Sequence, residues 1–216
     1  MDNLKNKSTS YIVGITGGFG TGKSLVGEIL QELDVTVIDT DEIVRNILKT
    51  KNNVTQKIQE EFGDNIINIK TDEYIDRKVL AKLVFDDDLK RKKLESIIHP
   101  EVNKILDSFI LQNKDKSIIA VLIPLLFECK LEDLYDEIWC VTCKNETQVE
   151  RLIKKGFTQE DIKLRINSQL SLDMKIKKSD FVIDNSDTVN ETKKQIILRL
   201  KELVRLNHNL HLSFDK

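Results

Sequence analysis

Glycines, a lysine and a serine occur near the start of the chain at a spacing that suits phosphate binding. Gly17 is followed after four residues by Gly22, Lys23 and Ser24, which gives the pattern Gly-x-x-x-x-Gly-Lys-Ser. The glycines let the backbone adopt positive φ angles and bring its N–H groups close to phosphate oxygens. The lysine supplies a point charge to the β- and γ-phosphates, and the serine hydroxyl is a ligand for Mg²⁺. The pattern predicts a phosphate-binding loop, here called the P-loop (residues 17–24).

The residues on either side of this loop complete a strand–loop–helix unit. Residues 11–16 form an apolar, β-branched run that is typical of a buried parallel strand. After the loop, Val26, Ile29 and Leu30 fall on one helical face, and a helix here adds its positive N-terminal end to the anion site. An ordinary glycine-rich turn is the alternative, and the flanking strand and helix argue against it. The predicted nucleotide contacts in this unit are Gly17, Gly18, Gly20, Thr21, Gly22, Lys23, Ser24 and Leu25.

Two carboxylates follow the next predicted strand. Residues 35–38 are apolar and lead into Asp39, Thr40 and Asp41. Side chains at the carboxyl end of a parallel strand lie at the edge where open α/β sheets bind their ligands. A helix is expected to begin near Asp41 and to carry Arg45 in its first turns. We therefore expect these side chains to line a ligand site.

Further apolar runs and amphipathic segments extend the alternation of strands and helices. Strands are expected at 117–123, 138–142 and 181–183, and helices at 146–155, 158–169 and 196–204. Residues 50–112 have helical periodicity and exceed what a crossover needs, so they predict an inserted helical lobe. The predicted fold class is α/β, with one P-loop domain over residues 1–216 and a parallel five-stranded sheet flanked by helices. Within it, residues 1–9 are expected to be a disordered lead, 145–170 a lid region and 207–216 a frayed tail that contains His208 and His211.

Composition limits the class of protein and its partners. The 216 residues are 40% hydrophobic and 32% charged, with a formal net charge of −2. This balance gives no electrostatic reason to expect nucleic acid or an anionic membrane as a partner. No apolar run approaches the ~20 residues of a membrane-spanning helix, and residues 1–9 lack the apolar core of a secretion signal. We expect a cytoplasmic protein, a monomer or weak homo-oligomer, whose partner is a small molecule.

Cysteines do not predict a disulfide framework or a metal site. Cys140 and Cys143 have C-x-x-C spacing, but they continue a predicted strand, and residues three apart on a strand point to opposite faces. Their thiols would lie ~10 Å apart along the strand, beyond the reach of a disulfide. Cys129 stands alone. We therefore expect structural cysteines.

Motifs beyond the P-loop narrow the class of nucleotide-binding protein. A GTPase would carry a guanine-reading Asn/Thr-Lys-x-Asp element on a later strand, and none is visible. Motor-type ATPases usually end a long apolar strand in a carboxylate, whereas here that strand runs into Pro124. The carboxylate pair, inserted lobe and later basic helical segment favour a small-molecule kinase. A nucleotide switch without net phosphotransfer is the alternative from another class.

Several motifs in a fixed order make the chain similar to one family. They are the P-loop, Ile-Asp-Thr-Asp at 38–41, Ile-Asp-Arg at 75–77, His-Pro at 99–100, Pro-Leu-Leu-Phe-Glu at 124–128, Gln148 with Arg151, Arg165 with Gln169, and Ile-Asp-Asn at 183–185. From residue 11 to about 186 the chain resembles the dephospho-CoA kinases, which complete coenzyme A synthesis. The resemblance implies ATP-dependent phosphorylation of the ribose 3′-hydroxyl of dephospho-CoA, with ATP and Mg²⁺ required. Another P-loop kinase, of the nucleoside-monophosphate or shikimate type, remains the alternative.

The resemblance also implies roles for the acceptor-side residues. Asp41 matches the carboxylate that the family places near the acceptor hydroxyl as candidate general base, although it could instead cap its helix. Asp39 could orient Arg45 or hold a water on Mg²⁺, with the same capping alternative. The remaining acceptor-side candidates are Arg45, Arg77, His99, Phe127 and Glu128. For Arg77 a plain surface role, for His99 a turn before proline, and for Phe127 and Glu128 a buried ring with a capping carboxylate are the alternatives.

On the nucleotide side the resemblance implies a lid arginine and an adenine-packing segment. Arg151 matches the lid residue whose guanidinium can bridge phosphate oxygens, and Asp184 with Asn185 falls where the family packs the adenine. The family often carries a second lid arginine four residues later, where this chain has Lys155. Lysine keeps the charge but lacks the planar two-pronged donor. The chain therefore departs from a two-arginine lid.

Overall fold

The computed structural model describes residues 10–68, 73–85, 87–207 and 210–212, and the chain divides into two units. One unit contains the residues up to Asp39 and those from Ile110 onward, and the other is Thr40–Phe109. The second unit thus begins at Thr40, whereas the inserted lobe was expected over 50–112. Its earlier start has a local cause, because the backbone N–H groups of Tyr74 and Ile75 bind the carbonyls of Lys49 and Leu48 at the end of the first helix of this unit.

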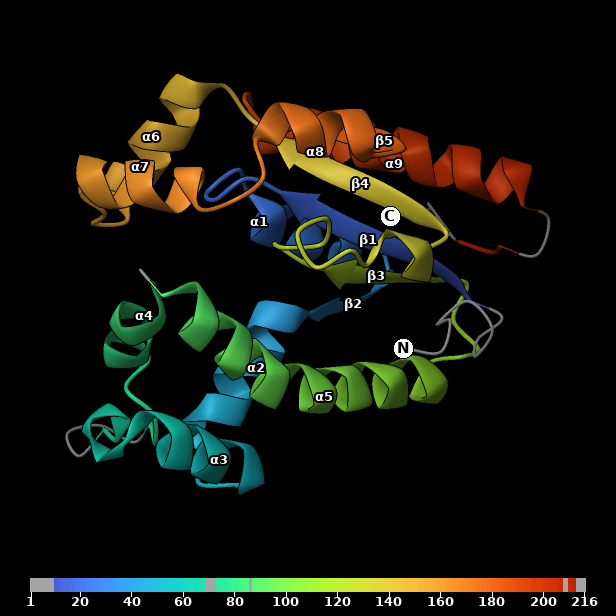
Figure 1. Cartoon of the computed structure of the whole chain (residues 1–216). Coiled ribbons are helices and arrows are strands. Elements are labelled where there is room, and N and C mark those ends of the chain that lie inside the picture. Colours follow the sequence, from blue (N-terminus) through green and yellow to red (C-terminus); the bar gives the residue numbers. More distant parts are fainter. Residues whose placement is uncertain (1–9, 69–72, 86, 208–209, 213–216) are drawn as a thin grey trace. The chain divides into compact units, whose positions relative to one another are not determined.

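A parallel sheet forms the centre of the first unit (Figure 1). Within the described residues it has five strands, in the order β2-β3-β1-β4-β5, and every pairing is parallel. The strands are β1 (Tyr11–Gly17), β2 (Thr36–Asp39), β3 (Ile118–Leu122), β4 (Glu137–Thr142) and β5 (Phe181–Asp184). This confirms the predicted sheet, and it puts β1, which leads into the P-loop, between β3 and β4.

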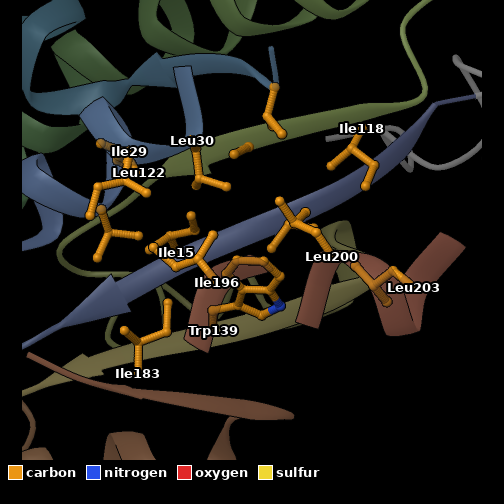
Figure 2. Close-up of a cluster of buried hydrophobic side chains, with 14 of the residues drawn as sticks. Ile15, Ile29, Leu30, Ile118, Leu122, Trp139, Ile183, Ile196, Leu200 and Leu203 are labelled. Carbon is orange, nitrogen blue, oxygen red and sulfur yellow. The ribbon is translucent and has the colours of Figure 1, made fainter. Parts of the chain in front are cut away.

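The main apolar core lies between one face of this sheet and two helices, α1 (Lys23–Glu32) and α9 (Val189–Leu206) (Figure 2). Alternate side chains of β1, such as Ile15, point to this face, as the period of two requires. Trp139 of β4 is 1% exposed and packs against the cluster from the sheet. Burying a large apolar side chain of this kind contributes about 1.5–3 kcal/mol. The apolar faces of α1 and α9, which the sequence pattern predicted, thus pack on the same face of the sheet.

The opposite face of the sheet is covered partly by the connection between β3 and β4. Gly14 of β1 faces it, and a Cβ atom there would come within 2.9 Å of the side chains of Tyr135 and Leu126. The connection includes a short 3-10 turn, η3 (Glu132–Leu134). The helix α8 (Leu172–Lys178) also contacts β1 and β4. Our sequence analysis did not predict α8, because seven residues are too few to show a clear period.

Two further helices belong to the first unit, in the predicted lid region. They are α6 (Asn145–Lys154) and α7 (Gln159–Asn167). Thr158 caps α7 by accepting a hydrogen bond from the backbone N–H of Asp161. Gly156, at φ 87°, lies in the turn between them. Helices were expected at 146–155 and 158–169, close to these bounds.

The second unit is helical in its described residues. Its elements are α2 (Thr40–Lys49), α3 (Asn53–Phe62), η2 (Asp64–Ile66), α4 (Arg77–Phe85) and most of α5 (Asp88–Gln112). Asn52 starts α3 with a capping box, in which its side chain and that of Thr55 exchange hydrogen bonds with each other's backbone. An isolated antiparallel bridge joins Ile67 to Ile75. The predicted helical character of this insert agrees with these elements.

Residues 210–212, close to the end of the chain, are better packed than expected. Leu210 is 4% exposed and belongs to the main core, and the backbone N–H of His211 donates to Ser117 Oγ at 3.0 Å. The expectation of a frayed tail over 207–216 is therefore wrong for residues 210–212. His208 and the expected lead at residues 1–9 lie outside the described residues. Leu210 and Leu212 follow the end of the last helix, so no helical period marked them as core residues.

The cysteines are structural within the described residues. Cys140 lies on β4 and Cys143 just beyond its end, both are buried, and none of the three cysteines is in a disulfide. Burial raises the pKa of the Cys140 thiol to about 11. In the described ranges, three or more His, Cys, Asp or Glu side chains nowhere gather as a metal site would require. None of the described helices combines the length and apolar character needed to cross a lipid bilayer.

Candidate active site

The P-loop leaves the carboxyl end of β1 and ends in the first turn of α1. Gly22 stands at the start of α1 with φ 107°, in the left-handed region that strains any other residue. A Cβ atom at Gly22 would also collide with the side-chain amide of Asn185. Both reasons require glycine at this point, and together they fix the direction in which α1 begins. Gly17 ends β1, and Gly18 and Gly20 lie in the loop between β1 and α1.

The charge of the P-loop is concentrated at its helix end. Lys23 is the first residue of α1, and its Nζ donates to the carbonyl oxygens of Gly17 and Gly18 at 3.2 Å each. The ammonium group thus lies across the loop, where phosphate oxygens would meet it. The first turn of α1 contains no acidic residue, so the positive end of the helix dipole is not neutralised by its own side chains. Ser24 is exposed in the same turn.

Asn185 anchors the P-loop to the rest of the first unit. Its side chain, 1% exposed, donates to the backbone carbonyl of Thr21 at 2.8 Å and accepts from Thr192 Oγ1 at 3.0 Å. Its backbone N–H binds the carbonyl of Thr142 at 2.8 Å. Thr21 is fully buried, and its hydroxyl donates to the carbonyl of Gly18 at 3.0 Å. The loop is thus held from inside by an asparagine that follows β5.

Helices α6 and α7 contact the outer side of the P-loop. Gln148 of α6 is buried, and its Nε2 donates to the carbonyl of Phe19 at 2.6 Å. The ring of Phe19 meets that of Phe157 edge-on at 5.2 Å between centroids. The guanidinium carbon of Arg165 on α7 lies 5.2 Å from the first centroid and 5.3 Å from the second. The predicted lid region therefore contacts the P-loop through one amide and two aromatic rings.

Arg151 and Lys155 occupy different environments in this lid region. Arg151 is half-buried on α6, and its Nη1 has no hydrogen-bond partner among the residues that the structure describes. Its guanidinium also bonds the thiol of Cys143: burial raises the pKa of that thiol, and the charge of Arg151 opposes the rise. Lys155 is exposed at the end of α6. Arg151 alone has a buried donor group left over for a ligand.

The acceptor-side edge of the first unit lies at the ends of β2 and β3. Asp39 is the last residue of β2 and is in register with Leu122 of β3, which in turn is in register with Ile15 of β1. The chain segment after β3 therefore leaves the sheet between Asp39 and the P-loop. Asp39 is half-buried there. It is the carboxyl edge of the parallel sheet, the edge at which open α/β sheets bind their ligands.

The segment after β3 is held by a buried ion pair. Glu128 Oε1 accepts from Lys175 Nζ at 2.9 Å and from the backbone N–H of Leu170 at 2.9 Å. Lys175 Nζ also donates to the carbonyl of Pro124 at 2.7 Å, and Thr16 Oγ1 donates to the same carbonyl at 3.2 Å. Lys175 is fully buried. One lysine on α8 thus fixes both ends of the loop that begins at Pro124.

Phe127, Leu25 and Asp184 were also predicted to contact ligands. Phe127 is 4% exposed, and the Nζ of Lys178 lies 5.1 Å from its ring centroid. Leu25 is partly buried on α1 and packs against the main core. Asp184 is exposed at the end of β5, and its Oδ1 accepts from the backbone N–H of Ser186 at 2.9 Å. The carboxylate of Asp184 and the backbone around it thus form the turn that presents Asn185.

Four predicted acceptor-side residues lie in the second unit, which is described here by itself. Asp41 is exposed in the first turn of α2, and Arg45 is exposed one turn later. Arg77 begins α4 and forms an exposed ion pair with Glu73 at 3.2 Å. His99 is exposed inside the long helix α5, where Pro100 follows it. The alternative in which His99 satisfies a turn is therefore wrong, because the chain continues as helix through both residues.

Sequence comparison decides the family once this geometry is known. The sequence profile of the dephospho-CoA kinase family matches residues 11–191. A curated dephospho-CoA kinase from Carboxydothermus hydrogenoformans is 42% identical over 194 residues, which cover 88% of this chain and 93% of that protein. The chain belongs to the dephospho-CoA kinase family. The resemblance found in the sequence motifs is thereby confirmed.

Solved structures agree with the family assignment. A crystal structure of a Thermus thermophilus protein matches with a TM-score of 0.78 and 28% identity, covering 90% of this chain and 98% of that one. A dephospho-CoA kinase from Campylobacter jejuni matches with a TM-score of 0.59 and 27% identity, covering 90% and 97%. The five-stranded parallel sheet flanked by helices is thus a P-loop kinase fold.

Our sequence analysis of this kinase family member missed three residues that support the site. Lys175 was overlooked because Lys177 and Lys178 make the segment look like a solvated basic face, yet Lys175 shares the inward face of α8 with Leu172 at a spacing of three. Gln148 was noted only as part of a motif, and Thr192 was not noted. No local pattern distinguishes these two, because their partners Phe19 and Asn185 are fixed by the tertiary fold.

Proposed function

We propose that this protein transfers the γ-phosphoryl group of ATP to the ribose 3′-hydroxyl of dephospho-CoA and so produces coenzyme A and ADP. The observation that carries the proposal is the family match over residues 11–191, which includes the P-loop and the segments at both sides of the site. The geometry of the first unit supports it, since Lys23 lies across the P-loop carbonyls at the N-terminal end of α1. Arg151 lies on α6, the helix whose Gln148 binds the P-loop carbonyl of Phe19.

The proposed step exchanges one phosphorus–oxygen bond for another. The acceptor 3′-oxygen forms a bond to the γ-phosphorus, and the bond from that phosphorus to the β,γ-bridging oxygen breaks. The electron pair of the broken bond stays on ADP, and the hydroxyl proton passes to a base. Catalysis of this step depends on positioning and on stabilising the charge that spreads over the phosphoryl oxygens.

Lys23 and Arg151 are the proposed catalytic cations. Lys23 Nζ lies across the P-loop carbonyls, so a bound triphosphate would exchange those weak neutral partners for charged oxygens. Arg151 has a buried, unpartnered Nη1 among the described residues, and a phosphate oxygen would satisfy it. Arg165, stacked on Phe19, is a further cation at the loop. We propose that Arg165, which lies against the P-loop residue Phe19, complements Arg151 in place of Lys155.

Mg²⁺ is proposed as the metal of the reaction. It usually takes one or two protein ligands and fills its octahedron with phosphate oxygens and water. The residues fit such an ion, because Ser24 offers an exposed hydroxyl in the first turn of α1 and Asp39 offers a carboxylate at the end of β2. The ion would supply charge neutralisation at the phosphates, and Ser24 would hold it while Asp39 would orient a water on it.

On the acceptor side we propose Asp41 as the base that takes the hydroxyl proton. Its exposure leaves its carboxylate accessible to a substrate, and its place after β2 follows the family motif. Arg45, Arg77 and His99 are proposed to bind the phosphate-rich and polar parts of dephospho-CoA. Phe127 and Glu128 are proposed to contact the acceptor from the first unit.

A phosphotransfer assay with a panel of acceptors tests the proposal. ADP release would be measured with dephospho-CoA, shikimate, AMP and CMP, and ³¹P NMR of the product would locate the new phosphate. We expect release only with dephospho-CoA, and a phosphomonoester on its 3′-oxygen. Release with shikimate or a nucleoside monophosphate would instead assign the protein to another kinase class. Equal ADP release without any acceptor would identify an ATPase or switch.

Location and assembly are proposed from composition alone. With a net charge of −2 and no candidate membrane span in its described helices, the protein is proposed to work in the cytoplasm as a monomer or weak homo-oligomer. Sedimentation at micromolar concentrations checks the second point. A stable tetramer would contradict it.

A further inference from the structure

A fully buried lysine connects three segments around the site of the first unit. Lys175 on α8 has no exposed surface, and its Nζ binds Glu128 Oε1 at 2.9 Å and the carbonyl of Pro124 at 2.7 Å. The Pro124 carbonyl also receives the hydroxyl of Thr16, the residue that precedes the P-loop. Charged side chains are almost never fully buried unless they are paired. We therefore look for the role of Lys175 in the groups that it binds inside the protein.

Only one carboxylate oxygen of its partner, Glu128, has hydrogen-bond donors among the described residues. Oε1 accepts from Lys175 and from the backbone N–H of Leu170, which follows α7 at the end of the lid region. Oε2 is buried and has no hydrogen-bond partner among the described residues. Buried polar atoms are rarely left unpaired in folded proteins. The two oxygens of one carboxylate thus differ, with one fixed by the protein and one open to a donor.

The position of Glu128 indicates where that donor comes from. Its loop leaves the sheet between Asp39 of β2 and the P-loop on β1, at the edge where this fold class binds ligands. Lys175 holds this loop at both Pro124 and Glu128, and Leu170 joins it to the lid region. Because this carboxylate is already held in place, it can accept a hydrogen bond from a hydroxyl or amino group without a further loss of side-chain entropy on binding.

We propose that Lys175 is a positioning residue that fixes Glu128 so that its Oε2 accepts a hydrogen bond from the acceptor substrate. The inference rests on the proposed function and extends it, because it names the atom, its buried support and the chemistry that it recognises: an O–H or N–H donor on dephospho-CoA. The hydrogen bonds of the pair go to Pro124 and Leu170, which lie outside residues 17–24 of the P-loop. The effect of Lys175 should therefore fall on the acceptor and not on ATP.

Three variants separate positioning from structural support. Lys175→Met leaves the Glu128 carboxylate buried without its cation, so both stability and acceptor binding should fall. Glu128→Gln keeps size and removes the charge. The double variant Lys175→Met/Glu128→Gln removes both charges and restores a neutral, filled interior. Lys177→Met is the matched control, because Lys177 is an exposed lysine two residues away on the same helix.

The measurements are steady-state KM for dephospho-CoA, KM for ATP, kcat and thermal midpoint. We expect Lys175→Met and Glu128→Gln each to raise the acceptor KM at least tenfold, with the ATP KM within twofold of the wild type. The double variant should regain most of the thermal midpoint lost by Lys175→Met and still show the raised acceptor KM. The control should match the wild type in every measurement.

Two results would overturn the inference. An acceptor KM within twofold of the wild type in the double variant would show that the pair only supports the fold. A parallel rise in both KM values would show that it shapes the whole site. A wild-type protein without ADP release on dephospho-CoA would overturn the proposed function as well, so the two failures are distinguishable.

Discussion

The side-chain amide of Asn185 donates a hydrogen bond of 2.8 Å to the backbone carbonyl of Thr21, a residue 164 positions earlier in the chain. The bond joins the end of β5 to the interior of the P-loop, although β5 is an edge strand and β1 lies two strands away. Because Thr192 occupies the other end of the amide, Asn185 cannot turn toward a ligand without leaving two buried groups unpaired. We therefore infer that Asn185 shapes the nucleotide site by supporting the P-loop from inside the fold.

Replacing Asn185 should weaken ATP binding. Asn185→Ala leaves the Thr21 carbonyl without its side-chain donor and leaves the Thr192 hydroxyl only its 3.4 Å bond to the Thr188 carbonyl. Such a loss costs about 1–3 kcal/mol for a buried group. Part of this loss falls on the fold and part on the P-loop shape, so we expect ATP affinity to fall about tenfold and the thermal midpoint to drop. Calorimetric titration with a non-hydrolysable ATP analogue measures the first effect.

Asn190→Ala is the matched control, since Asn190 is an exposed asparagine in the first turn of α9. It should leave both affinity and midpoint unchanged. An Asn185→Ala protein that melts early but binds the analogue normally would show that the anchor supports β5 and α9 and not the loop.

Lys23 and Ser24 should separate turnover from nucleotide binding. Lys23→Ala removes the side-chain charge that is proposed to face the transferring phosphate. We therefore expect no turnover above the background rate of the assay. Ser24→Ala should weaken Mg²⁺-dependent activity more than Mg²⁺-free nucleotide binding. Initial rates over a range of Mg²⁺ concentrations, with nucleotide binding measured in EDTA, distinguish the two. Near-normal turnover in Lys23→Ala would defeat the phosphotransfer proposal.

Arg151 of α6 and Lys155 at the end of this helix should differ in their kinetic effects. Arg151→Ala removes a half-buried guanidinium with an open Nη1 and should lower kcat about a hundredfold, the size of one lost charge-stabilising donor. Lys155→Ala removes an exposed charge and should change kcat less than threefold. Single-turnover rates at saturating ATP provide the comparison. Equal losses would show that Lys155 reaches the phosphates despite its missing two-pronged donor.

A buried carboxylate at the other end of the sheet should control stability without affecting catalysis. Glu137 is 3% exposed, and its Oε1 accepts from Arg199 Nε at 2.7 Å and from Trp139 Nε1 at 2.6 Å, while Oε2 accepts from the hydroxyl of Tyr11 at 3.2 Å. Glu137→Gln breaks this pair and should lower the free energy of unfolding by about 3 kcal/mol. Urea denaturation measures it.

Glu202→Gln is the matched control, because Glu202 binds the exposed end of the same arginine and its replacement should cost under 1 kcal/mol.

The hydrogen-bond network around Glu137 also predicts that stability depends on pH. Burial, and then the charge of Glu137, raise the pKa of the Tyr11 hydroxyl well above its usual value. The folded pKa lies above the unfolded one, so the stability from this hydroxyl is complete below about pH 10 and is lost as the pH rises further. Tyr11→Phe should remove that alkaline loss.

The sheet and the P-loop could be predicted because each depends on a local pattern. The strand runs that end at Gly17 and Leu122 are mostly apolar and are buried over nearly their whole length, as central parallel strands require. In contrast, α8 is short and its one inward lysine resembles its outward neighbours. Leu210 joins the core after the last helix has ended, so no period marks it. These features follow from tertiary packing that a local window does not contain.

The sequence indicated the residues that we propose to face the ligands, but not the residues that support them. Lys23 belongs to a motif whose spacing is fixed by phosphate chemistry, and Arg151 was indicated by the resemblance to the family. Gln148 and Lys175 act through backbone carbonyls, and any buried donor could serve that purpose. Their partners lie 129 and 51 residues away, respectively. Side-chain identity at such positions is therefore set by the path of the chain, which only the structure shows.

Asp41 provides the sharpest test of the proposed chemistry, because a base and a helix-terminal carboxylate make different demands. α2 begins at Thr40, so Asp41 lies in its first turn, where a negative charge also favours the helix by about 0.3–1 kcal/mol. Asp41→Asn keeps the size and most of the hydrogen-bonding ability at a helix start but cannot accept the proton.

A positioned general base contributes about 10²–10⁴-fold to a rate. Phosphoryl transfer through a loose transition state loses its proton late, so the lower end of that range applies. We expect Asp41→Asn to lower kcat about a hundredfold, with thermal midpoint and ATP affinity nearly unchanged. Glu42→Gln, at the next exposed carboxylate of the same turn, should keep full activity. An Asp41→Asn protein that turns over normally but melts early would make Asp41 a helix-stabilising residue, and the reaction would then proceed without it as a base.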